Sequence, residues 1–137
     1  MQTSQATKQR SESFYVGALL ALVGGFLDAY TYLSRDGVFA NAQTGNMVLL
    51  GIRLSEGRFL DALHYVFPIL AFAAGVLLAE WIQSAYKQSH SFHWRQLVLM
   101  LELVLLVAIG FVPDGALNPY DNIAVSFVCA MQVESFR

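Results

Sequence analysis

The sequence predicts an all-α membrane protein, a polytopic bundle of transmembrane helices. Hydrophobic residues make up 56% of the 137 positions and charged residues only 13%, against roughly 25% charged in ordinary soluble domains. Long apolar runs alternate with short polar connections, which is the pattern of helices that cross a bilayer. A polar break between the first two long runs adds a third observation, and it predicts that one helix is broken or re-entrant.

Four runs are predicted as membrane spans, since a helix of about 20 residues reaches across a bilayer core of about 30 Å. They cover approximately residues 14–33, 62–82, 97–112 and 123–137. The last run is short and ends in polar residues, so we expect it to be an incomplete span with further sequence downstream. Together the spans predict a single transmembrane domain over 14–137.

Residues 1–13 are polar and rich in Gln, Ser and Thr, which predicts a disordered leader. Lys8 and Arg10 precede the first apolar run, so a cleaved signal peptide is the alternative interpretation of that run. The length of the run and the spans that follow it favour a retained helix.

The polar break lies in the segment 38–54, whose first half is polar and second half apolar. We expect its polar residues to interrupt the helix and to form a substrate site: Asn41, Gln43, Thr44, Gly45 and Asn46. Irregular backbone is tolerated at membrane depth only where protein or a watery cavity surrounds it. The segment is therefore predicted to be a re-entrant half-helix whose amino end points at a ligand. A surface loop leading into an interfacial helix is the alternative.

The distribution of Lys and Arg does not decide whether this segment crosses the membrane. Cytoplasmic loops usually carry an excess of these residues. With re-entry or with crossing, the basic residues divide four against three between the two sides. The poor hydrophobicity of the segment favours re-entry.

Small residues recur every four positions in two spans and predict close helix packing, because lipid gives helices no hydrophobic reason to associate. One predicted packing face comprises Gly17, Ala21 and Gly25, continued by Ala29, and the other comprises Ala71, Gly75 and Ala79. We expect these faces to pack against each other or against a third helix. The alternative is that Gly and Ala are simply common in membrane helices.

Acidic residues inside predicted spans are candidates for proton or ion binding, because a charge is costly there. Asp28 and Glu102 are the two candidates, and Asp28 is also assigned to the substrate site. Structural hydrogen bonding is the alternative role for both. Glu80 lies near the end of a span, where reaching the headgroups explains it.

The remaining composition argues against several classes of function. Eight Lys and Arg residues and a net charge of −2 leave no basic stripe for nucleic acid. Cys129 is the single cysteine and is expected to be a packing residue. His90 and His93 fall in a polar connection that favours a solvated loop over a metal site. We expect no cofactor, no metal and no enzymatic activity.

Three stretches resemble the YoaK-like family of bacterial membrane proteins of unknown function. They read GGFLDAY from Gly24, GVFANAQTGNMVLLG from Gly37 and FVCAMQ from Phe127. The resemblance implies a multi-pass protein of the bacterial inner membrane that is longer than this chain, with a second Thr-Gly-Asn-like segment downstream. If the first segment re-enters, the two halves form an inverted repeat, as in many secondary transporters. If it crosses, the halves run parallel.

The sequence therefore predicts a small-solute transporter or permease with its site at the polar break. The alternative is a non-transporting scaffold or sensor in which the same polar residues only hold helices together. The expected partners are the lipid bilayer and a small solute, and homo-oligomerisation is left open.

Overall fold

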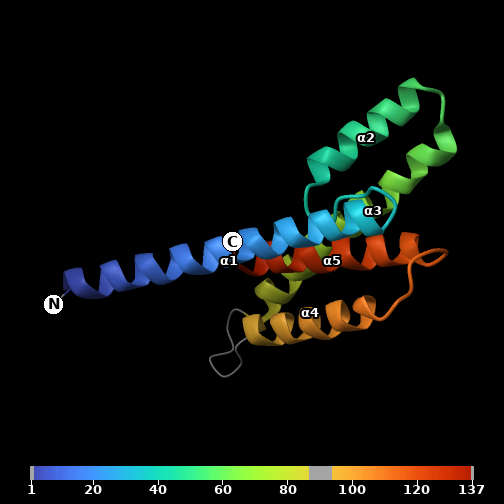
Figure 1. Ribbon diagram of the computed structural model, residues 1–137. Helices are drawn as coiled ribbons and strands as arrows, with labels where there is room; N and C mark the ends of the chain where they lie inside the picture. The colour runs from blue at the N-terminus through green and yellow to red at the C-terminus, as the bar shows by residue number, and fades with distance from the viewer. Residues whose placement is uncertain (1, 87–93, 137) are drawn as a thin grey trace.

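The computed structural model describes the backbone of residues 2–86 and 94–136 and the side chains of residues 14–85 and 98–136. This part of the chain is all-α, as predicted. The elements are α1 Gln2–Ser34, α2 Gln43–Ser55, α3 Phe59–Tyr86, α4 Trp94–Gly110 and α5 Asn118–Phe136 (Figure 1). The polar connection with His90 and His93 lies outside the described residues.

Helix α5 is the centre of the bundle, because it packs against α1, α3 and α4. α1 and α5 lie side by side in opposite directions, and α4 runs along another side of α5 (Figure 1). α2 packs chiefly on α3. Together, α2 and the first half of α3 form a hairpin that points away from the bundle (Figure 1). The end of α1, the tip of this hairpin and the α4–α5 connection lie at the same end of the molecule (Figure 1).

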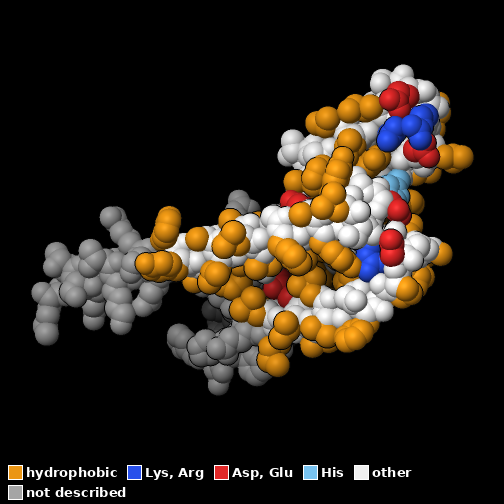
Figure 2. Space-filling view, viewed as in Figure 1, with side chains coloured by type: hydrophobic (Ala, Val, Ile, Leu, Met, Phe, Trp, Pro, Cys, Tyr) orange, Lys and Arg blue, Asp and Glu red, His pale blue; other side chains and the backbone are white. Residues whose placement is uncertain are grey.

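Two of the described helices are long and apolar enough to cross a membrane, over Phe14–Ser34 and Phe59–Ala85. They correspond to the predicted spans 14–33 and 62–82. The predicted span 97–112 is a shorter apolar helix, over Val98–Gly110. Large apolar side chains cover much of the visible surface, whereas charges gather at the tip of the α2–α3 hairpin (Figure 2). Residues at this tip include Arg53, Glu56, Arg58 and Asp61.

Helix α5 differs from the incomplete span predicted over 123–137. It begins at Asn118 and buries ten of its 19 residues, four of which are Asp, Asn or Ser in its first half. Pro119 lies in the first turn of α5, where a missing backbone N–H costs nothing. α5 is therefore a buried central helix with a polar start.

Helix α1 begins at Gln2, so the structure places residues 2–13 in a helix where we predicted a disordered leader. Adding a residue to an existing helix gains a hydrogen bond without a new nucleation cost. The polar residues of this stretch, mostly Gln, Ser, Lys, Arg and Glu, tolerate that extension. The long apolar helix that follows can therefore propagate into them.

The small residues of α3 lie against α5. Gly75 and Ala79 are buried and Ala71 is half-buried. A Cβ atom on Gly75 would lie 2.6 Å from the carbonyl oxygen of Phe127 and 2.7 Å from the Cβ of Ala130. Only glycine allows α3 and α5 to approach this closely.

The predicted packing face of α1 is not buried in the described chain. Gly17, Ala21, Gly25 and Ala29 are all exposed. The face that turns inward comprises Gly24, Leu27, Thr31 and Arg35. These positions are separated by three, four and four residues, an average close to the 3.6-residue period, whereas strict four-residue steps drift around the helix.

We predict that Gly75→Ala destabilises the protein although alanine is the better helix former. The added methyl group meets a backbone oxygen that cannot move alone, and such overpacking costs about 1–3 kcal/mol. Gly25→Ala is the matched control, because a Cβ added at Gly25 would meet nothing within 4 Å. Thermal unfolding of the full-length protein in detergent measures both, and equal midpoints for the two variants would contradict the α3–α5 contact.

Candidate functional site

The polar break begins with a reversal of the chain after α1. Asp36 and Gly37 both have positive φ angles, of 66° and 73°, a conformation that glycine adopts freely and aspartate tolerates. The two residues direct the chain back along α1. Residues 38–42 then run beside the helix before α2 begins at Gln43.

Asp28 holds this returning segment against α1. Its Oδ1 atom accepts hydrogen bonds from the backbone N–H groups of Asn41 at 2.6 Å and Ala42 at 3.2 Å. Both groups lie at the amino end of α2, where the helix dipole favours a negative charge. The Asp28 carboxylate therefore serves as the anchor of α2.

Asn46 binds the same segment from the other side. The fully buried Asn46 amide accepts from the N–H of Phe39 at 2.9 Å and donates to the carbonyl of Phe39 at 2.7 Å. It also donates to Oε1 of Gln43, whose own amide donates to the carbonyl of Ala40. The backbone groups of an irregular segment thus find partners within the protein, as burial away from water requires.

Two glycines make room for this arrangement. A Cβ on Gly45 would lie 2.8 Å from the Phe39 ring, and a Cβ on Gly24 would lie 2.9 Å from the side-chain nitrogen of Asn41. Phe39 in turn stacks on Tyr32 of α1, with ring centroids 4.6 Å apart. The glycine-containing stretches of the sequence are therefore explained by close packing of the break onto α1.

The predicted substrate residues separate into two groups. One group is bound within the protein: Asp28 accepts hydrogen bonds from the backbone, and Gln43 and Asn46 donate to backbone carbonyls. Gly45 also belongs to this group, because it lies under the Phe39 ring. Thr44 is exposed on α2. Asn41 is half-buried, and its side chain makes no hydrogen bond to a described residue. Of the predicted set, Asn41 is the half-buried residue whose side chain keeps its hydrogen-bonding groups free of described partners.

Asn41 lines a groove of about 310 Å³ between α1 and α5. The other residues that line it are Gly17, Leu20, Ala21, Gln132, Val133 and Phe136. The groove is mostly apolar, with the amides of Asn41 and Gln132 as its polar side chains. Ligand pockets commonly combine an apolar wall with a few polar groups that orient the ligand.

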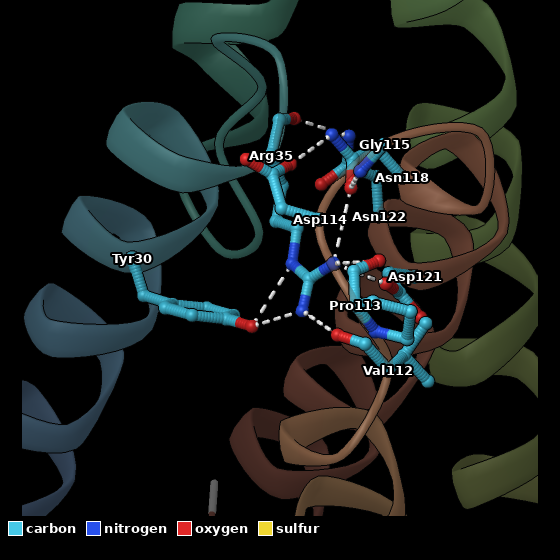
Figure 3. Close-up of polar contacts among 9 residues, drawn as sticks. All are labelled: Tyr30, Arg35, Val112, Pro113, Asp114, Gly115, Asn118, Asp121 and Asn122. Atoms are coloured by element: carbon cyan, nitrogen blue, oxygen red, sulfur yellow. Dashed lines mark hydrogen bonds and ion pairs between the residues drawn. The ribbon is translucent and has the colours of Figure 1, made fainter.

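Arg35 is the central residue of a second polar cluster, at the end of α1 (Figure 3). The side chain is buried, and the residue is 3% exposed. Its guanidinium forms an ion pair with Asp121 at 2.9 Å and donates to Asn118 at 3.0 Å, both on α5. It also donates to the Tyr30 hydroxyl at 2.6 Å and 2.9 Å. This cluster joins the end of α1 to the start of α5.

The same cluster fixes the α4–α5 connection. Arg35 donates to the carbonyl of Val112 at 2.8 Å, and Asn122 donates to the carbonyl of Arg35 at 2.6 Å. Burial disfavours the charged guanidinium, but the hydrogen bond to Tyr30 and the nearby carboxylates of Asp121 and Asp114 outweigh it and raise the pKa of Arg35. Arg35 therefore stays charged and joins three segments: the end of α1, the α4–α5 connection and the start of α5.

This cluster was not predicted from the sequence, in which Arg35 follows the first predicted span and residues 113–122 connect the last two predicted spans. The signal was present in Asn118, Asp121 and Asn122, which stand at helical spacing. Three polar residues on one face of a helix indicate a buried polar partner, and Arg35 is that partner.

The other ionisable residues of the predicted spans differ in their burial. Glu102 on α4 is 4% exposed and forms no hydrogen bond or ion pair with a described residue. Glu80 on α3 is exposed. Cys129 is buried, as expected for a packing residue. Within the described residues no group of three His, Cys, Asp or Glu side chains could hold a metal ion.

We predict that Arg35→Gln lowers the free energy of unfolding by about 3–5 kcal/mol, because it leaves the Asp121 carboxylate buried without its partner. Arg53→Gln is the matched control, since Arg53 lies at the hairpin tip and its ion pair with Glu56 is exposed to solvent, where such pairs contribute little to stability. Chemical unfolding in detergent measures the difference. The double variant Arg35→Gln/Asp121→Asn should be less destabilised than the sum of the single variants, and strict additivity would argue against a direct ion pair.

Comparison with known proteins gives two matches. A family model described as "Protein of unknown function (DUF1275)" matches residues 16–137. The UPF0700 transmembrane protein YoaK of Bacillus subtilis (strain 168) is 34% identical over 62 residues, which cover 45% of this chain and 28% of that protein. No solved structure matches the chain significantly.

Proposed function

The chain belongs to the DUF1275 family, which confirms the resemblance noted from its sequence, and we propose its function from the geometry of the polar break and the groove beside it. We propose that it is the membrane-embedded part of a small-solute transporter or permease of the bacterial inner membrane. The single observation that carries the proposal is the groove beside the polar break, into which Asn41 brings an uncommitted amide. The membrane setting agrees with the two candidate spans and with the transmembrane relative.

The segment from the end of α1 through α2 is the proposed re-entrant element. α2 has 13 residues, about 20 Å of helix, which is too short for a bilayer core of about 30 Å. Asp28, which anchors its amino end, stands six residues before the end of α1, about 9 Å back along the helix. The tip of the α2–α3 hairpin lies at the same end of the bundle as the end of α1 (Figure 1). The chain therefore enters and leaves on one side.

The proposed solute is small, uncharged and able to form hydrogen bonds. The groove holds about 310 Å³ and has no charged residue in its lining, so an ion would lose its hydration without compensation. The amides of Asn41 and Gln132 can each donate and accept a hydrogen bond. In the full-length protein, we expect the second half of an inverted repeat to close the open side of this groove.

The test is uptake by proteoliposomes that contain the full-length protein, with a panel of labelled polyols, amides and short-chain alcohols. Gly17→Leu should lower uptake at least about tenfold, equivalent to about 1.4 kcal/mol, because the new side chain fills the groove. Its added Cβ meets nothing within 4 Å, so the folded yield should not change. Gly25→Leu is the matched control, since it lies on α1 outside the groove.

Two outcomes would overturn the proposal. One is uptake no greater than that of empty liposomes for every solute of the panel. The other is a Gly17→Leu variant that transports like the wild-type protein, because the groove would then be unused.

A non-transporting scaffold or sensor is the second candidate function. The observation that favours it is that Asp28, Gln43 and Asn46 form their hydrogen bonds within the protein. Asn46→Ala and Asp28→Ala, made separately, distinguish the two functions. A loss of folded yield in detergent with no separate effect on uptake by the folded fraction would favour the scaffold.

A further inference from the structure

Glu102 is the buried acid that the polar break and the Arg35 cluster do not use. It lies on α4, is 4% exposed, and its Oε1 atom is fully buried without a hydrogen-bond partner. By contrast, Asp28 is bonded to two backbone amides and Asp121 is paired with Arg35. These three buried or half-buried acids thus divide into two with structural partners and one without.

We propose that Glu102 is a reversible proton-binding site inside the bundle. An isolated carboxylate in an apolar interior is very costly, so the neutral acid is the form that this packing accepts. α5 packs most extensively on α4 in the described part of the chain, and α3 contributes Ala79 and Ile82 to a buried cluster with Val98 of α4. Glu80, the acid beside Ala79 on α3, is exposed. The ionisable residues of α5 are Asp121, paired with Arg35, the buried thiol Cys129, and Glu134 and Tyr120. None of them supplies a positive charge to a Glu102 carboxylate.

A proton suits this site better than a metal cation. Hard cations such as Mg²⁺ and Ca²⁺ take six or more oxygen ligands, and the described residues contain no cluster of acidic, His or Cys side chains that could hold one. A single carboxyl group binds a single proton completely, forming the neutral acid. The chemistry of the donor set therefore selects H⁺.

The position of Glu102 allows proton binding to affect the groove through α5. α5 packs on α4 and also forms one wall of the groove, through Gln132, Val133 and Phe136. Release of the proton leaves an unpaired carboxylate at the α4–α5 interface, which must then rearrange or admit water. A shift of α5 changes the width of the groove. This coupling to solute movement rests on the proposed function, whereas proton binding itself does not.

Infrared spectroscopy of the detergent-solubilised full-length protein tests the binding site directly. A protonated carboxyl group in an apolar environment gives a C=O stretching band that shifts on transfer to heavy water and disappears when the proton is released. We expect such a band at mildly acidic pH and its loss at alkaline pH. Glu102→Gln should remove it, and Glu80→Gln, which changes an exposed acid on α3, should leave it unchanged.

The results separate this inference from the transport proposal. A titrating band that Glu102→Gln removes supports the proton site even if no solute of the panel is taken up. The absence of a titrating buried-acid band in the wild-type protein, or its persistence in Glu102→Gln, would overturn the inference even if uptake is observed. If Glu102→Gln does not fold, the heavy-water shift and the titration of the wild-type band still decide whether a buried acid binds a proton.

Discussion

The buried charge of Arg35 is the constraint on which the rest of the structure depends. A guanidinium removed from water needs partners for its N–H groups and a counter-charge, and here Tyr30, Asn118, Asp121 and the carbonyls of the α4–α5 connection supply them. These partners come from α1, from the α4–α5 connection and from α5. Satisfying one side chain therefore fixes the end of α1, the start of α5 and the turn between α4 and α5 together.

The contacts of Arg35 also set the geometry of the polar break. Once the end of α1 is fixed by Arg35, the next two residues reverse the chain, and Asp28 and Asn46 bind the returning backbone. Lipid cannot satisfy irregular backbone, so its partners must come from the protein. The result explains why polar side chains stand in an otherwise apolar sequence. It also leaves Asn41 as the residue of the break that lines the groove.

The acids of the bundle differ in what surrounds them, and this difference assigns their roles. Asp28 meets the amino end of a helix, Asp121 meets a guanidinium, and Glu102 meets no described polar partner. The first two stabilise the fold through these contacts. The third has no described partner that requires its charge, which is the observation behind the proposed proton site.

Composition and apolar run length determined the all-helical membrane character, the apolar parts of α1 and α3 and the position of the break, because these depend on local hydrophobicity and on residues that interrupt a helix. Tertiary structure decided which residues of the break remain available, since Gln43 and Asn46 could equally have met a ligand or the backbone. It also decided the inward face of α1, where Gly24 and not Gly25 is buried, and the pairing of Arg35 with α5, some 86 positions later at Asp121. Contacts between residues so distant in the chain follow from how helices are arranged in space, and no local pattern encodes that arrangement.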